Sequence, residues 1–324
     1  MTGRASVFSD DRIVRLLQSR FVAVTDNCSY TQRQDDAKGE FFRHIAEQGH
    51  YAGRTNPTAT RQGLYACTAD GDLLASVNTT NADRLLSVLE EALAAWDARE
   101  RVDTDAPGAY AADPRYARTF PEGGLILRET MRDLPRSGDP EASTWQHNFD
   151  YMWLTADEAE GLIPLDTAVG SQFEAPPAVV TRLARFHMVD HVRGEAPSWR
   201  AEDVEDARLM LRVESAEGAR VSMSVAGHVR VRRGPTEEEN PFSGFRVDTE
   251  RGVDVDGVVE VNPGARVVTE LRVVATGVRW GATTYNGRSK DLGPAPIGFA
   301  FELIPDTPEN RTPPKFVPGS YFSK

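Results

Sequence analysis

The character of the sequence changes near residue 100, and this change constrains the fold more than any other feature. Before it, apolar segments typical of strands alternate with segments of helical spacing, whereas after it nearly every apolar segment is typical of a strand. We therefore expect an α/β domain followed by a β-rich, antiparallel sandwich or barrel. The expected boundaries are a first domain over residues 1–100, a linker over 101–118, a β-rich domain over 119–305 and a surface tail over 306–324.

The first domain contains local signals for three helices and three strands. Residues 21–25 are apolar and β-branched, which is typical of a buried strand, and Asp70-Gly71 signals a hairpin turn. Asn81 or Thr80 can cap an amphipathic helix. The expected elements are helix 11–17 capped by Ser9, Asp10 or Asp11, strand 21–25, helix 31–48, strands 63–68 and 73–77, and a last helix with Leu85, Leu86, Leu89, Leu93 and Trp96 on one face.

The second domain is expected to be built mainly from strands. A Ser-Ala-Glu-Gly turn separates two apolar segments and predicts a hairpin. Helical signals are sparse, and a short helix capped by Thr155 is the main one. The expected strands are 125–127, 208–214, 220–225, 228–232, 258–261, 267–275 and 298–303.

Composition narrows the classes of partner and location. The chain has 324 residues, 40% of them hydrophobic and 27% charged, which is ordinary for a globular protein. A net charge of −12 argues against nucleic acid or an anionic membrane as the main partner. No segment approaches the roughly 20 apolar residues of a membrane span, and the first twelve residues are polar. Because only two cysteines are present, we expect a cytoplasmic protein without a disulfide framework.

Cys28 is the candidate for chemistry. It follows the expected strand 21–25 and precedes the expected helix 31–48, where unpaired backbone N–H groups and the helix dipole favour a thiolate. Thr31, one helical turn on, could donate a hydrogen bond to the sulfur. The alternative is that Cys28 has no chemical role in a domain that only binds. Cys67, in the middle of an expected strand, is expected to face the core and to be inert.

The order helix, strand, Cys-bearing turn, long helix, loop, hairpin and helix over residues 9–100 resembles the thioredoxin-like superfamily. Cys28-Ser29-Tyr30-Thr31 lies where that family has its Cys-x-x-Cys motif, with Thr31 in place of the second cysteine. The resemblance implies that Cys28 is the attacking cysteine and that an external thiol resolves its products. Segments 186–195, 280–281 and 298–303 also resemble bacterial thioredoxin-like proteins with an uncharacterised C-terminal β-domain.

The polar segment 51–62 is expected to end next to Cys28. Arg54 and Arg61 could hold an anionic substrate or stabilise the thiolate, with Gln62 and Tyr30 as further substrate-binding candidates. A solvated loop rich in small polar residues explains the same composition equally well.

Three functions follow from these features. The first is a thiol-dependent redox protein that uses Cys28, needs no cofactor, and has a low-molecular-weight thiol or a protein disulfide as its partner. The second is a non-catalytic binding or scaffold protein, because Thr31 replaces the second cysteine and Arg61-Gln62 occupy the place of the family's cis-proline. The third is a zinc, copper or iron site formed by Cys28, His187 and His191, although hydrogen-bonded strand ends explain these histidines better.

Overall fold

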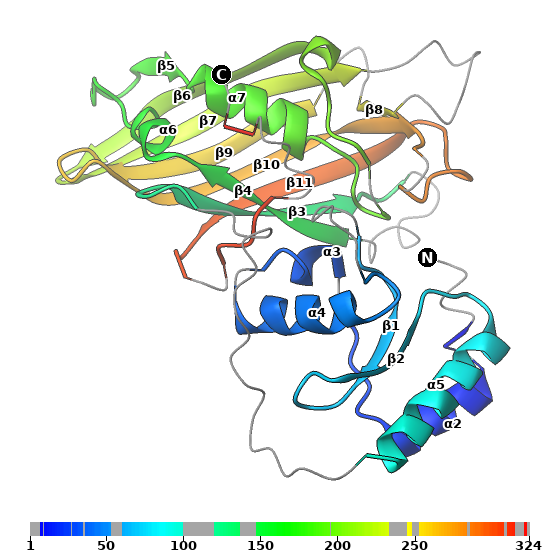
Figure 1. The fold of residues 1–324 in the computed structure, drawn as a ribbon. Helices are drawn as coiled ribbons and strands as arrows, with labels where there is room; N and C mark the ends of the chain where they lie inside the picture. Colours follow the sequence, from blue (N-terminus) through cyan, green and yellow to red (C-terminus); the bar gives the residue numbers. More distant parts are fainter. Residues whose placement is uncertain are drawn as a thin grey trace. The chain divides into compact units, whose positions relative to one another are not determined.

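The computed structural model divides into two compact units, Met1–Thr119 and Phe120–Lys324 (Figure 1). The expected linker over residues 101–118 lies outside the part that the structure describes. The described residues are 7–8, 10–26, 28–34, 36–52, 60–99, 120–136, 147–194, 196–232, 245–247, 253–283, 286–307, 310–314 and 321–322.

The N-terminal unit combines helices with one hairpin. The hairpin turns at Gly71, whose φ of 90° is readily adopted by glycine, and Thr68 N–H donates to Asp72 O (2.9 Å). The hairpin predicted from Asp70-Gly71 is therefore confirmed. The elements of this unit are α2 (Asp11–Arg20), α3 (Cys28–Thr31), α4 (Ala37–Gln48), β1 (Leu64–Cys67), β2 (Leu73–Val77) and α5 (Ala82–Asp97).

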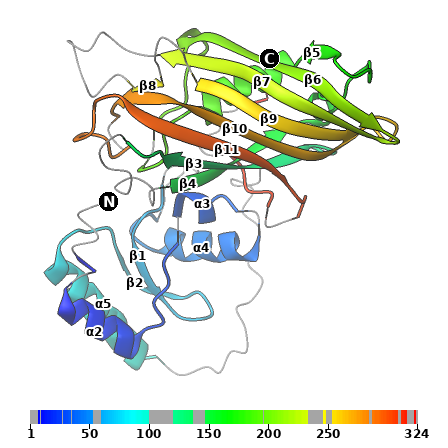
Figure 2. The same cartoon turned by 180° about the vertical axis from the view of Figure 1, so that it is seen from behind.

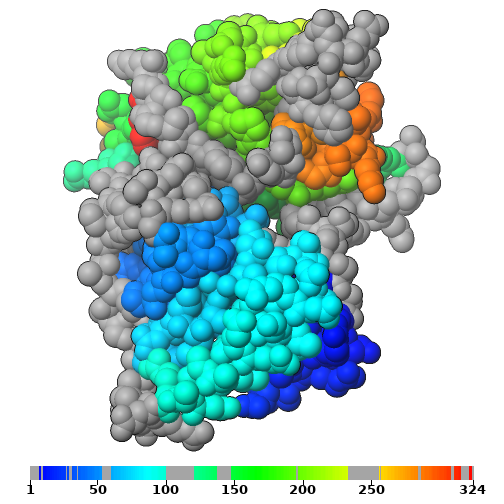
Figure 3. Space-filling view, turned by 45° about the vertical axis from the view of Figure 1, so that its right-hand side comes forward, coloured from blue at the N-terminus to red at the C-terminus, as the bar shows by residue number. Residues whose placement is uncertain are grey.

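Helices α2 and α5 pack side by side (Figure 3, dark blue and cyan). Ile13 of α2 and Leu85 and Leu89 of α5 form their shared core, as the apolar spacing of α5 predicts. Trp96, predicted on the same face, is exposed. Asp10 caps α2 by accepting from Arg12 N–H, so the predicted start of this helix is confirmed.

Asn81, rather than Thr80, caps α5, because its side-chain oxygen accepts from Arg84 N–H (2.8 Å). We expect Asn81→Ala to destabilise α5 by about 1 kcal/mol, since one backbone donor loses its partner. Hydrogen exchange of the first-turn amides of α5 measures the effect. Thr80→Ala is the matched control and is expected to leave exchange unchanged; equal effects of both substitutions would contradict the assignment of the cap.

Two predictions for this unit are wrong. Residues 21–25 form no strand, and Val22 and Val24 are 93% and 84% exposed. A strand requires a neighbour to pair its backbone groups, and the sheet of this unit contains only β1 and β2 among the described residues. The expected helix 31–48 is also interrupted, because α3 ends at Thr31 and α4 begins anew after its cap, Asp36.

Within its described residues, the C-terminal unit is built on one antiparallel sheet of nine strands, so the β-rich, antiparallel prediction is confirmed. The order is β4-β3-β11-β10-β8-β7-β6-β5, with β9 paired to both β10 and β7. The strands join one sheet, not the two packed sheets of a sandwich. Their bounds are β3 (Leu125–Asp133), β4 (His147–Leu154), β5 (Gln172–Glu174), β6 (Val204–Glu217), β7 (Arg220–Arg232), β8 (Phe245–Val247), β9 (Val253–Asn262), β10 (Val267–Gly281) and β11 (Ala295–Ile304).

Alternating apolar residues place one face of this sheet in the core. Leu209, Leu211 and Val213 of β6 are buried and separated by more exposed residues, which is the period-two pattern of a strand with one wet face. The β6–β7 hairpin turns at Gly218, with a φ of 60°. The predicted strands 220–225 and 228–232 are parts of the single strand β7.

Short helices cover the apolar face of the sheet: α6 (Ala156–Glu160), α7 (Pro177–Arg182) and the π-helix η1 (Leu183–His187) (Figure 1). The predicted cap of α6 is confirmed, because Thr155 and Glu158 form a reciprocal capping box. A further short 3-10 helix, η2 (Ala201–Asp203), precedes β6. Figure 2 shows the opposite face of the sheet, with β7, β9 and β10 in front. Among the described helices, none is both long and apolar enough to span a membrane.

Candidate functional site

Cys28 begins the short helix α3. Its carbonyl accepts from Gln32 N–H (3.0 Å), and its side chain is half-buried. Both Cys28 and Cys67 are present as thiols. A helix of four residues aligns few peptide dipoles, so it does little to stabilise a thiolate through its macrodipole. The sequence predicts that the dipole of a long helix stabilises the Cys28 thiolate. The short helix α3 does not provide such a dipole.

Two buried arginines fix the segment that follows α3. Arg43 of α4 donates through Nη1 to the carbonyl oxygens of Gln32 (3.2 Å) and Gln34 (2.6 Å). The backbone N–H of Arg61 donates to Gln32 Oε1 (2.8 Å). The two bonds from Arg43 satisfy backbone carbonyl groups that follow α3, and the bond from Arg61 satisfies the side-chain amide oxygen of Gln32. The segment after Cys28 is thus held by α4 and by the residues that precede β1.

Arg61 is fully buried and paired within the protein. Its Nη2 and Nε donate to Glu47 Oε1 (3.0 and 3.2 Å), and its guanidinium lies 5.9 Å from the centre of the Tyr51 ring. A buried guanidinium with a carboxylate partner does not present its charge to a dissolved anion. The guanidinium of Arg61 is thus used by Glu47, and its backbone N–H binds the Gln32 side chain; its role as a substrate ligand stays a prediction.

Tyr65 connects this arrangement to the thiol. Its hydroxyl donates to Arg61 O (2.6 Å), and the ring of His50 stacks on it at 5.1 Å between centroids. Burial raises the pKa of Tyr65, and electrostatic interactions with Tyr51 and Cys28 raise it further. Tyr65 therefore remains a neutral hydrogen-bond donor within electrostatic reach of Cys28. We call Cys28, Gln32, Arg61 and Tyr65 the Cys28 cluster.

The other predicted residues of this site are placed differently. The hydroxyl of Thr31 is buried and has no hydrogen-bond partner among the described residues, so the predicted bond to the sulfur is not formed. Gln62 is exposed, and its carbonyl oxygen accepts from Tyr51 Oη (2.9 Å). Arg54 and the side chain of Tyr30 lie outside the described residues.

Cys67 differs from Cys28 in its surroundings. It ends β1 and is half-buried, rather than mid-strand and in the core. Burial raises the pKa of its thiol, and the carboxylate of Asp70 adds to the shift. Both effects keep Cys67 protonated at neutral pH, which agrees with the prediction that it is inert.

The C-terminal unit contains a buried polar chain that passes through His187, the last residue of η1. The backbone N–H of Trp153 donates to Tyr321 Oη (3.2 Å). Tyr321 Oη lies 2.8 Å from His187 Nε2, and His187 Nδ1 lies 2.7 Å from Glu129 Oε2. One tautomer satisfies the chain: His187 donates through Nδ1 and accepts at Nε2. Burial lowers the pKa of His187 to about 4, with Asp150 opposing the shift, so the ring is neutral at pH 7.

Tyr321 anchors the end of the chain. Its carbonyl oxygen accepts from Arg182 Nε (3.0 Å), and the guanidinium of Arg182 lies 4.8 Å from the centre of its ring. Arg182 also donates through Nη2 to Glu158 Oε1 (2.7 Å). Burial raises the pKa of Tyr321 well above its ordinary value, which keeps it a donor to His187. The expected surface tail therefore contains a residue that is part of the core.

The metal alternative has little support in this geometry. Both ring nitrogens of His187 have partners, and Nδ1 of His191 accepts from Ala196 N–H (3.2 Å). Over the described ranges, no three His, Cys, Asp or Glu side chains are grouped closely enough to hold a metal ion.

A second buried network is centred on Arg288, whose side chain is fully buried. Its Nη2 and Nη1 donate to Asp133 Oδ1 (2.6 Å) and Oδ2 (3.0 Å), and its Nε donates to Asp190 Oδ2 (2.7 Å). Arg193 donates through Nε to Asp133 Oδ2 (2.8 Å), and Asp291 accepts from Arg136 (2.7 Å). This network joins β3 to the loops that follow η1 and β10.

The sequence contains one signal for both networks that the predictions did not use. Along β3, Leu127, Glu129, Met131 and Asp133 alternate with more exposed residues and are all buried. Carboxylates at inward positions of a strand imply buried partners. The strand period therefore points to Glu129 and Asp133, whereas no local pattern marks Arg288 or Tyr321.

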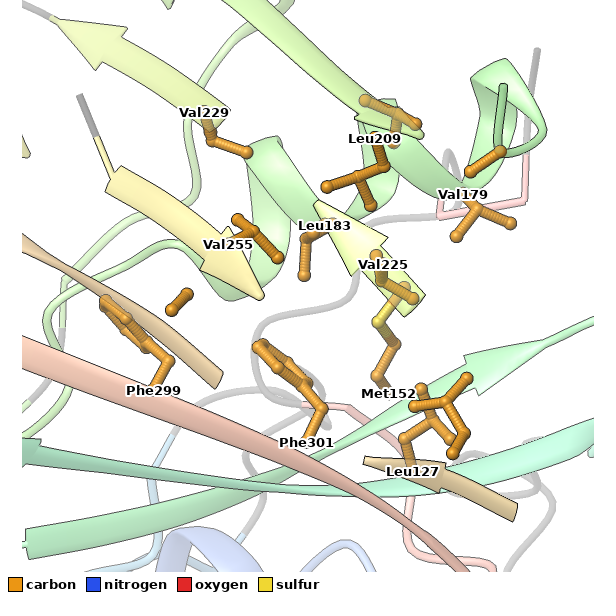
Figure 4. Close-up of a cluster of buried hydrophobic side chains, with 14 of the residues drawn as sticks. Leu127, Met152, Val179, Leu183, Leu209, Val225, Val229, Val255, Phe299 and Phe301 are labelled. Atoms are coloured by element: carbon orange, nitrogen blue, oxygen red, sulfur yellow. The ribbon is translucent and has the colours of Figure 1, made fainter. Parts of the chain in front are cut away.

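An apolar cavity of about 50 Å³ lies between the sheet and α7. Every side chain that lines it is apolar, among them Met152, Leu183 and Phe301 (Figure 4). At about 24 cal/mol per Å³, such a cavity costs about 1 kcal/mol of stability.

Comparisons with known proteins add no identification. A scan against protein-family models, a search of curated proteins and a search of solved structures each found no match to this chain.

Proposed function

We propose that this chain is a thiol-dependent redox protein in which Cys28 is the single nucleophile. The observation that carries the proposal is the position of Cys28: a half-buried thiol at the start of α3, followed by a segment whose backbone Arg43 holds and whose Gln32 side chain is bound by the Arg61 N–H. The motif Cys28-Ser29-Tyr30-Thr31 and the hairpin followed by α5 support membership of the thioredoxin-like superfamily, whereas the strand expected before Cys28 is not formed. Because Cys28 is only half-buried, its sulfur can reach and attack a dissolved partner.

The reaction is disulfide exchange with an external reductant. The Cys28 thiolate attacks one sulfur of a partner disulfide, an S–S bond forms to that sulfur, and the other sulfur leaves as a thiolate. A low-molecular-weight thiolate then attacks the partner's sulfur in the mixed disulfide. The S–S bond between Cys28 and the partner breaks, and Cys28 leaves as a thiolate. The product is a disulfide between the small thiol and the partner's sulfur. Cys28 is regenerated and contributes no net electrons: the external thiolate supplies the electron pair of the new S–S bond, and the thiolate released in the first step carries away the pair of the broken S–S bond.

The setting that suits this chemistry is a reducing compartment such as the cytoplasm, since thiols persist there. The net charge of −12 favours protein or small-molecule partners over nucleic acid and anionic membranes.

We expect Cys28 to be alkylated by iodoacetamide at least ten times faster than Cys67 at pH 7, with a half-maximal rate below the ordinary thiol pKa of about 8.5. The reason is that burial and the Asp70 carboxylate raise the pKa of Cys67, whereas the proposal requires Cys28 to be the reactive thiol. Mass spectrometry of the intact chain across pH 5–10 separates the two sites.

Two matched variants test whether this reactivity is functional. Cys28→Ser should abolish reduction of a model disulfide by a small thiol catalysed by the protein, and Cys67→Ser should leave it intact. Retention of activity in Cys28→Ser, or slow alkylation of Cys28 at every pH, would eliminate the redox proposal.

A second candidate is a non-catalytic binding or scaffold protein. The four-residue length of α3 and the unbonded hydroxyl of Thr31 favour it, because both remove stabilisation that the thiolate would otherwise have. Slow alkylation of Cys28 in the folded chain is the result that this candidate predicts.

A further inference from the structure

Among the described side chains, the network around Arg288 contains more cations than carboxylates. We call it the Arg288 network, and its members are linked by ion pairs: four arginines, Arg136, Arg193, Arg279 and Arg288, and three aspartates, Asp133, Asp190 and Asp291. A guanidinium is always charged in proteins, and a carboxyl group with guanidinium partners is ionised at pH 7. The network therefore has one positive charge that no carboxylate of its own balances.

The four guanidinium groups converge on one carboxylate oxygen. The groups that contact Asp291 Oδ2 are Arg136 Nη2 (2.7 Å), Arg193 Nη1 (3.0 Å), Arg288 Nη1 (3.3 Å) and Arg279 Nη2. A carboxylate oxygen has about two lone-pair sites, so it cannot accept hydrogen bonds of good geometry from four donors at once. A second anion beside Asp291 would share these donors.

Two buried donors show the same shortage of acceptors. The side chains of Arg279 and Asn286 are fully buried, and Arg279 Nε and Asn286 Nδ2 have no hydrogen-bond partner within the described part of the chain. Asn286 lies in the loop between β10 and β11 that also contains Arg288, and its Oδ1 accepts from the backbone N–H of Arg288 (3.3 Å). Buried donors without an acceptor are rare in folded proteins, and a bound ion or water is a common explanation.

Arg279 is the cation that the aspartates compensate least. Burial lowers the pKa of its guanidinium, and the charge of Arg288 lowers this pKa further, although Asp190 and Asp291 oppose the shift. Arg288, in contrast, has both Asp133 (2.6 Å) and Asp190 (2.7 Å) as close partners. A further negative charge is therefore most favourable near Asp291, which Arg279 contacts.

The network is open to solvent on the side of Arg136 and Arg193. Their side chains are 38% and 24% exposed, and that of Asp291 is 15% exposed. A dissolved anion can therefore reach the guanidinium groups around Asp291 without unfolding the core. The planar N–H fork of arginine fits the two oxygens of one oxyanion, which a halide ion does not have.

We propose that the C-terminal unit binds a small, singly charged oxyanion, the carboxylate of an organic acid, beside Asp291 on the solvent-facing side of the Arg288 network. Arg136 and Arg193 bind the ligand where the network is exposed, and Arg279 supplies the uncompensated charge. A singly charged ligand brings the net charge of the network to zero. The second unit thus has a recognition function of its own, directed at the acidic group of a ligand.

Acetate is the probe, and the NMR signal of the Arg279 Nε–H in the full chain is the readout. We expect this signal to shift saturably as acetate replaces chloride at constant ionic strength, because Arg279 is the uncompensated cation of the site. The Nε–H of Arg182, which is buried and donates to Tyr321 O (3.0 Å), is the internal control and should not shift. No shift, a shift that does not saturate, or an equal shift of both signals would overturn the proposal.

Removing the excess charge provides the first variant. Arg136→Gln neutralises the network at a partly exposed position, so we expect acetate affinity to fall about ten-fold, the effect of losing one charge-assisted hydrogen bond. Arg208→Gln is the matched control, because Arg208 forms an exposed pair with Glu174 (2.7 Å), and it should leave acetate affinity unchanged. Equal affinities of the two variants would reject the site.

Asn286→Asp tests the charge balance from inside the chain and serves if Arg136→Gln fails to fold. The substitution keeps the shape of the side chain and replaces the unbonded Nδ2 with a carboxylate oxygen. We expect the thermal midpoint to rise and acetate affinity to fall about ten-fold, because the new carboxylate supplies the missing negative charge. In a network that is already balanced, one more buried carboxylate lowers the midpoint, and that result would overturn the proposal.

Discussion

Replacing Arg288 with methionine is expected to destabilise the C-terminal unit by about 3–5 kcal/mol, the cost of leaving buried charges without their partner. Asp133 and Asp190 are 1% and 0% exposed, and both accept hydrogen bonds from the Arg288 guanidinium. Methionine fills much of the same volume but offers no donor. Asp133 would keep Arg193 as a partner (2.8 Å). Asp190 would lose its bonds to a cation, so we expect it to carry most of the penalty.

Urea unfolding followed by tryptophan fluorescence measures this loss, because four of the five tryptophans lie in the C-terminal unit. Arg208→Met is the control. Arg208 pairs with Glu174 at 2.7 Å, but both side chains are largely exposed, so its removal should cost no more than about 1 kcal/mol. Similar effects of the two substitutions would show that burial of the Arg288 network does not govern its energetic importance.

His187 is expected to make the stability of the C-terminal unit depend on pH between about 6.5 and 4. Burial lowers the pKa of His187 from 6.5 to about 4 in the folded protein. The folded state therefore resists protonation, and the unfolded state binds the proton first. The stability contributed by neutral His187 is fully present above pH 6.5 and is lost as the pH falls towards 4. The difference of about 2.5 pH units corresponds to about 3 kcal/mol.

The free energy of unfolding of the wild-type chain and of His187→Gln, measured at pH 7, 5.5 and 4, isolates this contribution. Glutamine can donate and accept as the imidazole does, but it does not titrate. We expect the stability advantage of the wild type over this variant to shrink by about 3 kcal/mol from pH 7 to pH 4. Tyr321→Phe, which removes the hydroxyl bonded to His187 Nε2 but keeps the titrating ring, should retain the pH dependence. An advantage that stays constant with pH would contradict the prediction.

The Arg288 network titrates in a different range, so it does not obscure this effect. Burial opposes ionisation of Asp133 and Asp291, but hydrogen bonds and charge from Arg288 and Arg136, respectively, lower the pKa of each carboxyl below its ordinary value. Carboxylates with a lowered pKa stabilise the fold above about pH 4, and this contribution is lost only as the pH falls further. The two pH windows therefore separate the contribution of His187 from that of the carboxylates.

The sequence by itself determined the elements whose cause is local. Asp10 and Thr155 cap α2 and α6 where predicted, and Asp70-Gly71 turns the β1–β2 hairpin. The alternation along β6 gives both the strand and its buried face. In each case a side chain acts on backbone groups within a few residues, or a short period selects one face, so no distant partner is needed.

Tertiary structure decided the elements and sites that depend on distant partners. Residues 21–25 have strand composition but form no strand, because no neighbour pairs with them in the described structure. The bond between Arg288 and Asp133 joins residues 155 positions apart, and Tyr321 reaches His187 across 134 positions. Burial of a charge is stable only when a complementary group is present at the same point in space. Local patterns specify a helix cap or an inward-facing carboxylate, but only the packed chain determines which arginine or tyrosine meets it.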